Sequence, residues 1–230
     1  MNNKNIKIHF IGISGIGMSG IAEIMISLGY KVFGSDLNDS YNVKRLREMG
    51  ATVHIGHRAE QITDDLDLVI FSAAIPETNP EMKEARAKLL PIMRRAEIIA
   101  ELMRLKKGIA IAGTHGKTTT TSFVSTILHQ ANLDPTCLVG GIVRFLKSNA
   151  REGDGDFILV EADESDGAFL KYNPVYSVVT NIDDDHIDHY GSIEKVEEAF
   201  LSFINNVAFF GKAVINYDDV RLRDLIPKIK

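Results

Sequence analysis

The chain has 230 residues, of which 45% are hydrophobic and 25% are charged, and its formal net charge at pH 7 is −5. These values are those of an ordinary globular chain, and the length predicts two domains. Lysine and arginine are scattered along the sequence, so no basic patch indicates nucleic-acid binding. The single cysteine, Cys137, cannot form an internal disulfide, which favours a reducing, cytoplasmic compartment.

The first predicted element is an apolar strand at residues 6–11, followed by a glycine-rich loop, a helix near 18–29 and a second strand near 31–34 that ends in Asp36. This order predicts a Rossmann-like unit, whose loop and helix N-terminus bind a pyrophosphate. The glycines from Gly12 are spaced G-x-x-G-x-G, whereas those from Gly15 match the G-x-G-x-x-G of dinucleotide enzymes. By itself the pattern suggests NAD with Asp36 on its ribose, although close packing of helix on strand can demand the same glycines.

Further strands near 52–55 and 68–72 and helices near 42–49 and 79–88 continue this parallel α/β unit. An amphipathic helix at 96–106 leads to Lys107 and Gly108, which we interpret as a C-cap and domain junction. We therefore expect one domain over residues 1–106 and a second over 107–230. The uncharged stretch at 10–22 is rich in glycine and shorter than the ~20 apolar residues of a membrane span, so we expect no membrane insertion.

The second domain opens with the strongest signal in the chain. A strand near 109–112 enters Gly113-Thr114-His115-Gly116-Lys117-Thr118-Thr119, and a helical pattern follows through Phe123 and Ile127. Such a loop turns backbone N–H groups toward phosphates, with a lysine for charge and a hydroxyl for Mg²⁺. Only two residues separate the glycines, against four in the usual phosphate-binding loop. We expect a nucleotide site here, and an ordinary turn is the alternative.

Two acidic runs follow strands predicted near 157–161 and 176–180, ahead of a last strand near 213–216. The first run starts at Glu161, and the second extends from Asp183 to His189. Ligands collect at the carboxyl ends of parallel strands, so these runs and the phosphate loop are expected to converge. Oxygen ligands suit Mg²⁺, while a histidine also suits Mn²⁺. The alternative is that each run is only a solvated loop.

Taken together, these segments resemble the Mur ligase family of peptidoglycan synthesis, and the match runs in order along essentially the whole chain. The resemblance implies a Rossmann-like UDP-binding domain followed by a P-loop α/β ATP-binding domain that is incomplete, without the family's C-terminal domain. A natural short nucleotide-binding protein is the alternative. The motifs that carry the resemblance are 12–23, Ser72-Ala73-Ala74-Ile75-Pro76, 113–119, Glu161-Ala162-Asp163-Glu164-Ser165-Asp166 and Thr180-Asn181-Ile182-Asp183 with Asp185-His186.

The resemblance also implies roles for individual residues. In the first domain the UDP-sugar would bind at Gly12, Ser14, Gly15, Gly17, Met18, Ser19, Asp36, His57, Ser72, Ala73 and Ala74; Ser14 stands where the family commonly has glycine, and a surface histidine is the rival interpretation of His57. In the second domain ATP would bind at Gly113, Thr114, His115, Gly116, Lys117, Thr118 and Thr119. Thr118, Glu161 and His186 would hold metal, and Lys117, Glu161 and His186 would be catalytic.

The implied reaction is ATP-dependent amide formation between L-alanine and the carboxylate of UDP-N-acetylmuramate through an acyl phosphate. ATP and Mg²⁺ would be the cofactors, with Mn²⁺ as the alternative metal, and this chain alone is expected to be inactive. Three alternatives stay open: a related ligase that recycles UDP-N-acetylmuramate peptides, an NAD-binding dehydrogenase, and a nucleotide-binding regulator. The oligomeric state and the choice of amino acid are not specified by the sequence.

Overall fold

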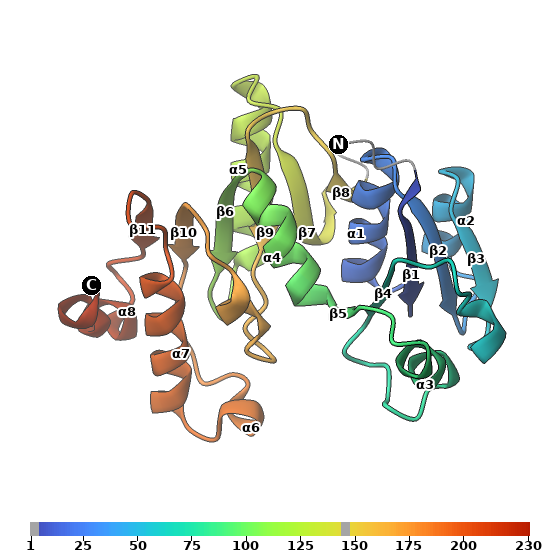
Figure 1. The fold of residues 1–230 in the computed structure, drawn as a ribbon. Helices are drawn as coiled ribbons and strands as arrows, with labels where there is room; N and C mark the ends of the chain where they lie inside the picture. The colour runs from blue at the N-terminus through green and yellow to red at the C-terminus, as the bar shows by residue number, and fades with distance from the viewer. Residues whose placement is uncertain (1–4, 144–147) are drawn as a thin grey trace. The chain divides into compact units, whose positions relative to one another are not determined.

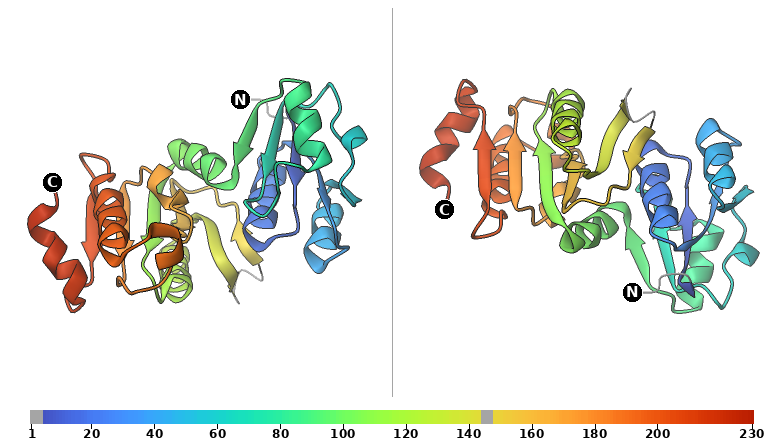
Figure 2. Two further views of the ribbon diagram at one scale, coloured as in Figure 1. Left: turned by 90° about the horizontal axis from the view of Figure 1, so that it is seen from below. Right: turned by 90° about the horizontal axis from the view of Figure 1, so that it is seen from above.

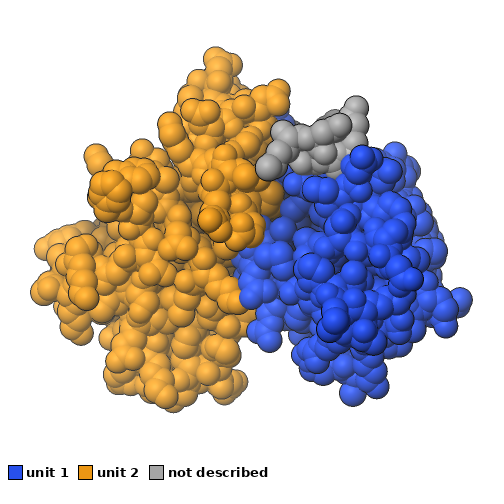
Figure 3. All heavy atoms as spheres, viewed as in Figure 1, with its two compact units in different colours: residues 1–98, 146–152 blue, residues 99–145, 153–230 orange. Residues whose placement is uncertain are grey.

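The computed structural model describes residues 5–143 and 148–230. It has the predicted α/β class, with two mainly parallel sheets (Figure 1). Contacts divide the chain into unit 1, residues 1–98 with 146–152, and unit 2, residues 99–145 with 153–230 (Figure 3). We expected a boundary after residue 106; the contacts instead divide the chain inside helix α4 (Arg95–Leu105). They also group strand β8 (Ser148–Arg151) with unit 1, because this strand packs on helix α1 (Ile16–Ser27).

Unit 1 is built on a five-stranded sheet of order β3-β2-β1-β4-β5, in which neighbouring strands are parallel. Helices α1 and α2 cover one face and α3 the other (Figure 2). The chain order reverses direction between β1 and β4, so the carboxyl ends of these strands flank the crevice in which such sheets bind ligands. The bounds are β1 Lys7–Ile11, β2 Lys31–Asp36, α2 Tyr41–Glu48, β3 Thr52–Ile55, β4 Leu68–Phe71, α3 Pro80–Ala87 and β5 Ile92–Arg94.

Unit 2 contains most of a six-stranded sheet of order β11-β10-β6-β9-β7-β8, and helix α5 packs on β6, β7 and β9. Strand β6 lies between β9 and β10 and is parallel to both, so the ends of these three strands meet at one edge, as the sequence predicts. The bounds are β6 Lys107–Ala112, α5 Lys117–Gln130, β7 Thr136–Val143, β8 Ser148–Arg151, β9 Phe157–Glu161, β10 Tyr176–Val179, α6 Ile187–Tyr190, α7 Ile193–Asn205, β11 Lys212–Ile215 and α8 Val220–Leu225.

One local prediction is wrong, and two further features differ from what the sequence pattern alone suggests. Lys107 and Gly108 start strand β6 instead of capping a helix. The buried side of α5 carries Thr121 and Ser125, whereas Phe123 and Ile127 are 66% and 65% exposed. Strands β5, β7 and β8 were not predicted, because β5 is only three residues long and β7 contains the pair Gly140-Gly141, and short or glycine-containing strands give weak patterns. In the described part of the chain, no helix has the length and apolar character needed to cross a bilayer.

Candidate functional site

The glycine-rich loop of unit 1 is fastened to the end of β2. Gly12, with φ +77°, and Ile13 both donate their N–H groups to Ser35 O, at 2.9 and 3.0 Å. Ser14 N donates to Asp36 Oδ2 at 2.9 Å. The first hydrogen bond of the α1 turn is Ser19 N to Gly15 O, so the N–H groups of residues 15–18 are those that a phosphate would meet at the helix N-terminus. Among the residues predicted to bind the pyrophosphate, Gly15, Gly17 and Met18 are therefore the candidates to donate a backbone N–H group to it.

Two asparagine side chains form hydrogen bonds with the same loop, and an arginine side chain lies close to it. Asn42 Nδ2 donates to Ser14 O at 2.8 Å, and Asn149 Nδ2 donates to Ile16 O at 2.6 Å. A Cβ at Gly17 would lie 2.6 Å from Nη1 of Arg95, so only glycine allows this guanidinium to approach the start of α1. The structure thus places the positive charge of Arg95 beside the candidate phosphate site.

One further predicted sugar-binding segment lies near this loop. The turn formed by Ser72, Ala73 and Ala74 follows β4, where Ser72 N donates to Ile11 O at 3.2 Å, and a Cβ at Gly12 would lie 3.4 Å from the Ser72 Cβ. The loop and the turn thus follow the carboxyl ends of the adjacent strands β1 and β4. Their contacts with a sugar nucleotide stay a prediction.

His57 belongs to a polar cluster with Ser35, on strand β2, and Glu81. Its Nδ1 lies 2.9 Å from Ser35 Oγ and 3.3 Å from Glu81 Oε2, and its side chain is only 11% exposed. The interpretation of His57 as a surface histidine is therefore wrong. Glu81 is fully buried and accepts a hydrogen bond from Ser35 Oγ at 2.5 Å, so this cluster supports the end of β2 that fastens the glycine-rich loop.

In unit 2 the predicted phosphate loop joins β6 to α5 with the geometry of an anion site. Thr114 to Thr119 and Glu161 line a cavity of about 270 Å³. Gly113 and Gly116 have φ values of +130° and +80°, which turn the backbone toward the N-terminus of α5. Lys117 Nζ donates to Gly113 O at 2.7 Å, to Thr114 O at 3.1 Å and to Glu164 Oε1 at 2.7 Å.

Thr118 and Glu161 meet in the same cavity. Thr118 Oγ1 donates to Glu161 Oε1 at 2.8 Å, and Gly140 N donates to Glu161 Oε2 at 2.7 Å. A Cβ at Gly140 would lie 2.6 Å from Glu161 Oε1, so the glycine in β7 is what lets the carboxylate sit there. Glu161 is thereby aimed from β9 at the first turn of α5.

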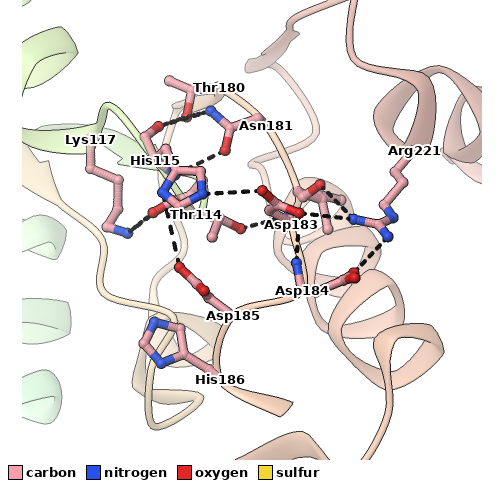
Figure 4. Close-up of polar contacts among 12 residues, drawn as sticks. Thr114, His115, Lys117, Thr180, Asn181, Asp183, Asp184, Asp185, His186 and Arg221 are labelled. Atoms are coloured by element: carbon pink, nitrogen blue, oxygen red, sulfur yellow. Dashed lines mark hydrogen bonds and ion pairs between the residues drawn. The ribbon is translucent and has the colours of Figure 1, made fainter.

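The loop is tied to the end of β10 (Figure 4). Asn181 Oδ1 accepts from His115 N at 2.9 Å, and Asn181 Nδ2 donates to His115 O at 2.9 Å. Asp183 N donates to Thr114 Oγ1 at 2.8 Å. The oxygen and the nitrogen of the Asn181 side-chain amide thus both position the loop.

His115 and Arg221 lie on opposite sides of the Asp183 carboxylate (Figure 4). His115 Nε2 is 3.2 Å from Asp183 Oδ2, and Arg221 Nη1 is 3.4 Å from Asp183 Oδ1. Arg221 Nη2 also donates to Asp184 Oδ1 at 2.6 Å. The hydrogen bond from Asp184 N, the His115 side chain and the nearby Arg221 charge hold the pKa of Asp183 below its usual value. The predicted acidic run is thus largely paired.

Glu164 is the most buried carboxylate of the site, with 1% exposure. Burial raises its pKa, although the hydrogen bond and charge of Lys117 oppose the rise. Tyr190 Oη donates to Glu164 O at 2.5 Å, and burial together with the charges of Glu164, Asp166 and Asp163 raises the pKa of Tyr190 to about 12, so the phenol keeps its proton at neutral pH. His186 has a left-handed φ of +63°, and its Nε2 lies 3.5 Å from Glu164 Oε1.

The predicted metal ligands are only partly brought together. Thr118 and Glu161 offer a hydroxyl and a carboxylate side by side, which suits Mg²⁺, because this ion is usually held by one or two carboxylates plus phosphates and water. His186 contacts Glu164, and it makes no hydrogen bond or ion pair with Glu161 in the described residues. Among those residues, no group of three or more His, Cys, Asp or Glu side chains is arranged to hold a metal.

The two loop glycines allow a matched test of this geometry. A Cβ at Gly113 would lie 2.0 Å from Thr180 Oγ1 and 3.0 Å from Thr180 N, whereas a Cβ at Gly116 would meet nothing within 4 Å. We expect Gly113→Ala to weaken ATP binding and to lower the free energy of unfolding by roughly 1–3 kcal/mol, because it adds a clash to left-handed strain. Gly116→Ala should reduce both ATP affinity and the free energy of unfolding by less. Calorimetric titration with ATP and urea unfolding would check both; equal effects would contradict the close packing of Gly113 on β10.

The sequence did not reveal several features of the two sites, because each is a contact between residues that are far apart in the chain. These features are the contacts of Gly140, Arg221 and Asn149 and the direct contact of Glu164 with Lys117. The pair Gly140-Gly141 inside an otherwise apolar stretch was an available signal, since glycine within a strand often marks a close approach.

The chain matches two family models, "Mur ligase family, catalytic domain" over residues 7–126 and "Mur ligase middle domain" over residues 111–230. It is 54% identical to the UDP-N-acetylmuramate–L-alanine ligase of Trichlorobacter lovleyi over 97% of this chain and 49% of that protein. The ligase of the same name from Mesorhizobium japonicum is 56% identical, over 97% and 48%. The chain thus spans about half the length of these curated relatives.

Two solved structures support the fold assignment. The UDP-N-acetylmuramate–alanine ligase of Thermotoga maritima matches with a TM-score of 0.86 and 35% identity, over 96% of this chain and 51% of that one. The UDP-N-acetylmuramate:L-alanyl-γ-D-glutamyl-meso-diaminopimelate ligase of Neisseria meningitides has a TM-score of 0.89 and 27% identity, over 97% and 75%. Given both family models, the two sheets and the phosphate loop between β6 and α5, this chain belongs to the Mur ligase family.

Proposed function

We propose that this chain supplies the UDP-sugar-binding part and part of the ATP-binding part of a cytoplasmic ligase that joins L-alanine to UDP-N-acetylmuramate. The observation that carries the proposal is the cavity in which Lys117, Thr118 and Glu161 meet at the N-terminus of α5. The identities of 54% and 56% to L-alanine ligases support the choice of substrate.

The chemistry follows from bringing two anions together. A carboxylate oxygen of the muramate attacks the γ-phosphorus of ATP, the bond to the bridging oxygen breaks, and ADP leaves. The amine of L-alanine then attacks the acyl carbon of the acyl phosphate, and phosphate leaves as the amide forms, with loss of a proton from the nitrogen. Carboxylate and triphosphate repel each other, so the site must neutralise and orient them.

Residues of this chain are suited to that task. The Lys117 ammonium would bind phosphate oxygens, and backbone N–H groups at the start of α5 would orient them. Thr118 and Glu161 would hold Mg²⁺, which supplies further neutralisation of the phosphates when it is bound. His186 remains our candidate for a ligand nearer the substrate carboxylate. In unit 1, the N–H groups of residues 15–18 and Arg95 would receive the pyrophosphate of the UDP-sugar, and Asp36 would act mainly by fixing Ser14.

The dehydrogenase alternative predicts a different ligand for unit 1. We expect calorimetric titration of the 230-residue chain to give tighter binding of UDP-N-acetylmuramate than of NADH. Asp36 Oδ2 already accepts the Ser14 N–H, so it is poorly placed to offer that oxygen to a nicotinamide-cofactor ribose. Tighter binding of NADH would overturn the ligase proposal.

A ligase for UDP-N-acetylmuramate peptides is the second candidate, because the Neisseria structure has a TM-score of 0.89. Its identity of 27% is about half the 54% of the Trichlorobacter L-alanine ligase, which favours L-alanine. An assay of phosphate release by the protein that contains this chain, with L-alanine and with L-alanyl-γ-D-glutamyl-meso-diaminopimelate as rival amines, would decide between them.

A further inference from the structure

The Lys117 ammonium is fully engaged by acceptors from its own protein. An ammonium has three N–H donors, and Lys117 Nζ has three acceptors: two loop carbonyls and Glu164 Oε1. A phosphate oxygen can therefore bind Lys117 only by replacing or sharing one of them. The two carbonyls belong to residues 113 and 114 of the same loop, whereas Glu164 comes from the loop after β9.

Lys117 makes the shortest contact with the Glu164 carboxylate, and His186 Nε2 lies farther away, at 3.5 Å from the same oxygen. The Glu164 side chain is 2% exposed, and its Oε2 has no hydrogen-bond partner among the described residues. Tyr190 fixes the Glu164 backbone through the carbonyl oxygen. A buried carboxylate with one unpaired oxygen is costly unless a cation compensates its charge, and Lys117 at 2.7 Å is the nearest one.

We propose that Glu164 is a positioning residue that competes with a phosphate of the nucleotide for the Lys117 ammonium. The inference rests on the proposed function, because it requires a nucleotide at this loop. Before phosphate binds, Glu164 keeps the Lys117 ammonium in contact with the carbonyl oxygens of the loop. When phosphate binds, one anion replaces another on the same N–H donor, so Glu164 lowers nucleotide affinity while it keeps the lysine in place for the exchange.

The test is Glu164→Gln, which keeps the size and an acceptor oxygen but removes the charge. The ion pair with Lys117 then becomes a weaker hydrogen bond from an ammonium to a neutral amide oxygen. We therefore expect ATP, titrated with Mg²⁺ into the 230-residue chain, to bind about five- to tenfold more tightly. Asp166→Asn is the matched control. Asp166 is exposed, its Oδ1 accepts from Ala168 N, and it lies in the same loop without contacting Lys117 in the described structure.

The outcomes separate the explanations. Tighter binding by Glu164→Gln with little change in Asp166→Asn supports the competition. Equal tightening by both variants would indicate a general charge effect and overturn it, as would unchanged or weaker binding by Glu164→Gln. If the unsubstituted chain binds no ATP, the proposed function itself fails.

A second measurement does not depend on nucleotide. Acylation of Lys117 by acetic anhydride, followed by peptide mass spectrometry, reports how firmly the amine is held. Lys117 should be acylated faster in Glu164→Gln than in Asp166→Asn. The two variants are compared once their melting temperatures are shown to be similar, so that a difference in stability does not explain the rates. An unchanged rate would show that Glu164 does not hold the lysine.

Discussion

Replacing Lys117 with methionine is expected to weaken ATP binding by roughly ten- to a hundredfold, the largest functional loss of any single change in the phosphate loop. A hydrogen bond to a charged group contributes about 1.5–3 kcal/mol, and each 1.4 kcal/mol is a factor of about ten in affinity. Methionine fills the space of the lysine stem without the ammonium that would meet the phosphates.

Lys107→Met provides the control for this measurement. Lys107 is at the opposite end of β6, and its Nζ lies 3.6 Å from Asp156 on the surface. Calorimetric titration with ATP and Mg²⁺ should show normal affinity for Lys107→Met and weak binding for Lys117→Met, with melting temperatures to confirm that both fold. Normal affinity in Lys117→Met would rule out this loop as the nucleotide site.

Phe169→Ala is expected to have the largest effect on stability, a loss of about 3–5 kcal/mol in the free energy of unfolding of unit 2. Phe169 is fully buried in the short helix that follows the Glu161–Gly167 loop. Its ring centroid lies 5.4 Å from that of Phe200 and 5.0 Å from that of Phe203, both on α7. The substitution would remove both aromatic contacts and leave a cavity under the loop that carries Glu161 and Glu164.

The matched control is Phe209→Ala, at a side chain that is 99% exposed. It should change stability by no more than about 0.5 kcal/mol, because no buried apolar area is lost. Urea unfolding followed by far-UV circular dichroism measures both, with a transition fitted for each unit because a chain of two compact units need not unfold in a single two-state step. A loss below 1 kcal/mol in Phe169→Ala would contradict the packing of this helix on α7.

The sequence by itself determined the features that are local in the chain. An apolar strand, a glycine turn and the start of a helix are adjacent in sequence, so the phosphate loop at residues 113–119 was recognisable from residue type and spacing. The same holds for the glycine-rich loop after β1 and for Glu161 at the end of β9. Alternation of strands and helices also implied parallel sheets, whose strand ends meet at one edge, and the observed neighbours of β6 confirm this.

Tertiary structure alone decided which groups are engaged and which are left for a ligand. The N–H groups of Gly12, Ile13 and Ser14 donate to Ser35 and Asp36. The candidate donors to a phosphate are therefore the N–H groups at the start of α1. Lys117 and Glu164 are 47 residues apart in sequence, yet 2.7 Å apart in space. The side of α5 that is buried carries Thr121 and Ser125, against its apolar pattern. These features depend on strand order and on the close approach that Gly140 permits, and a pattern of residue types along the chain specifies neither.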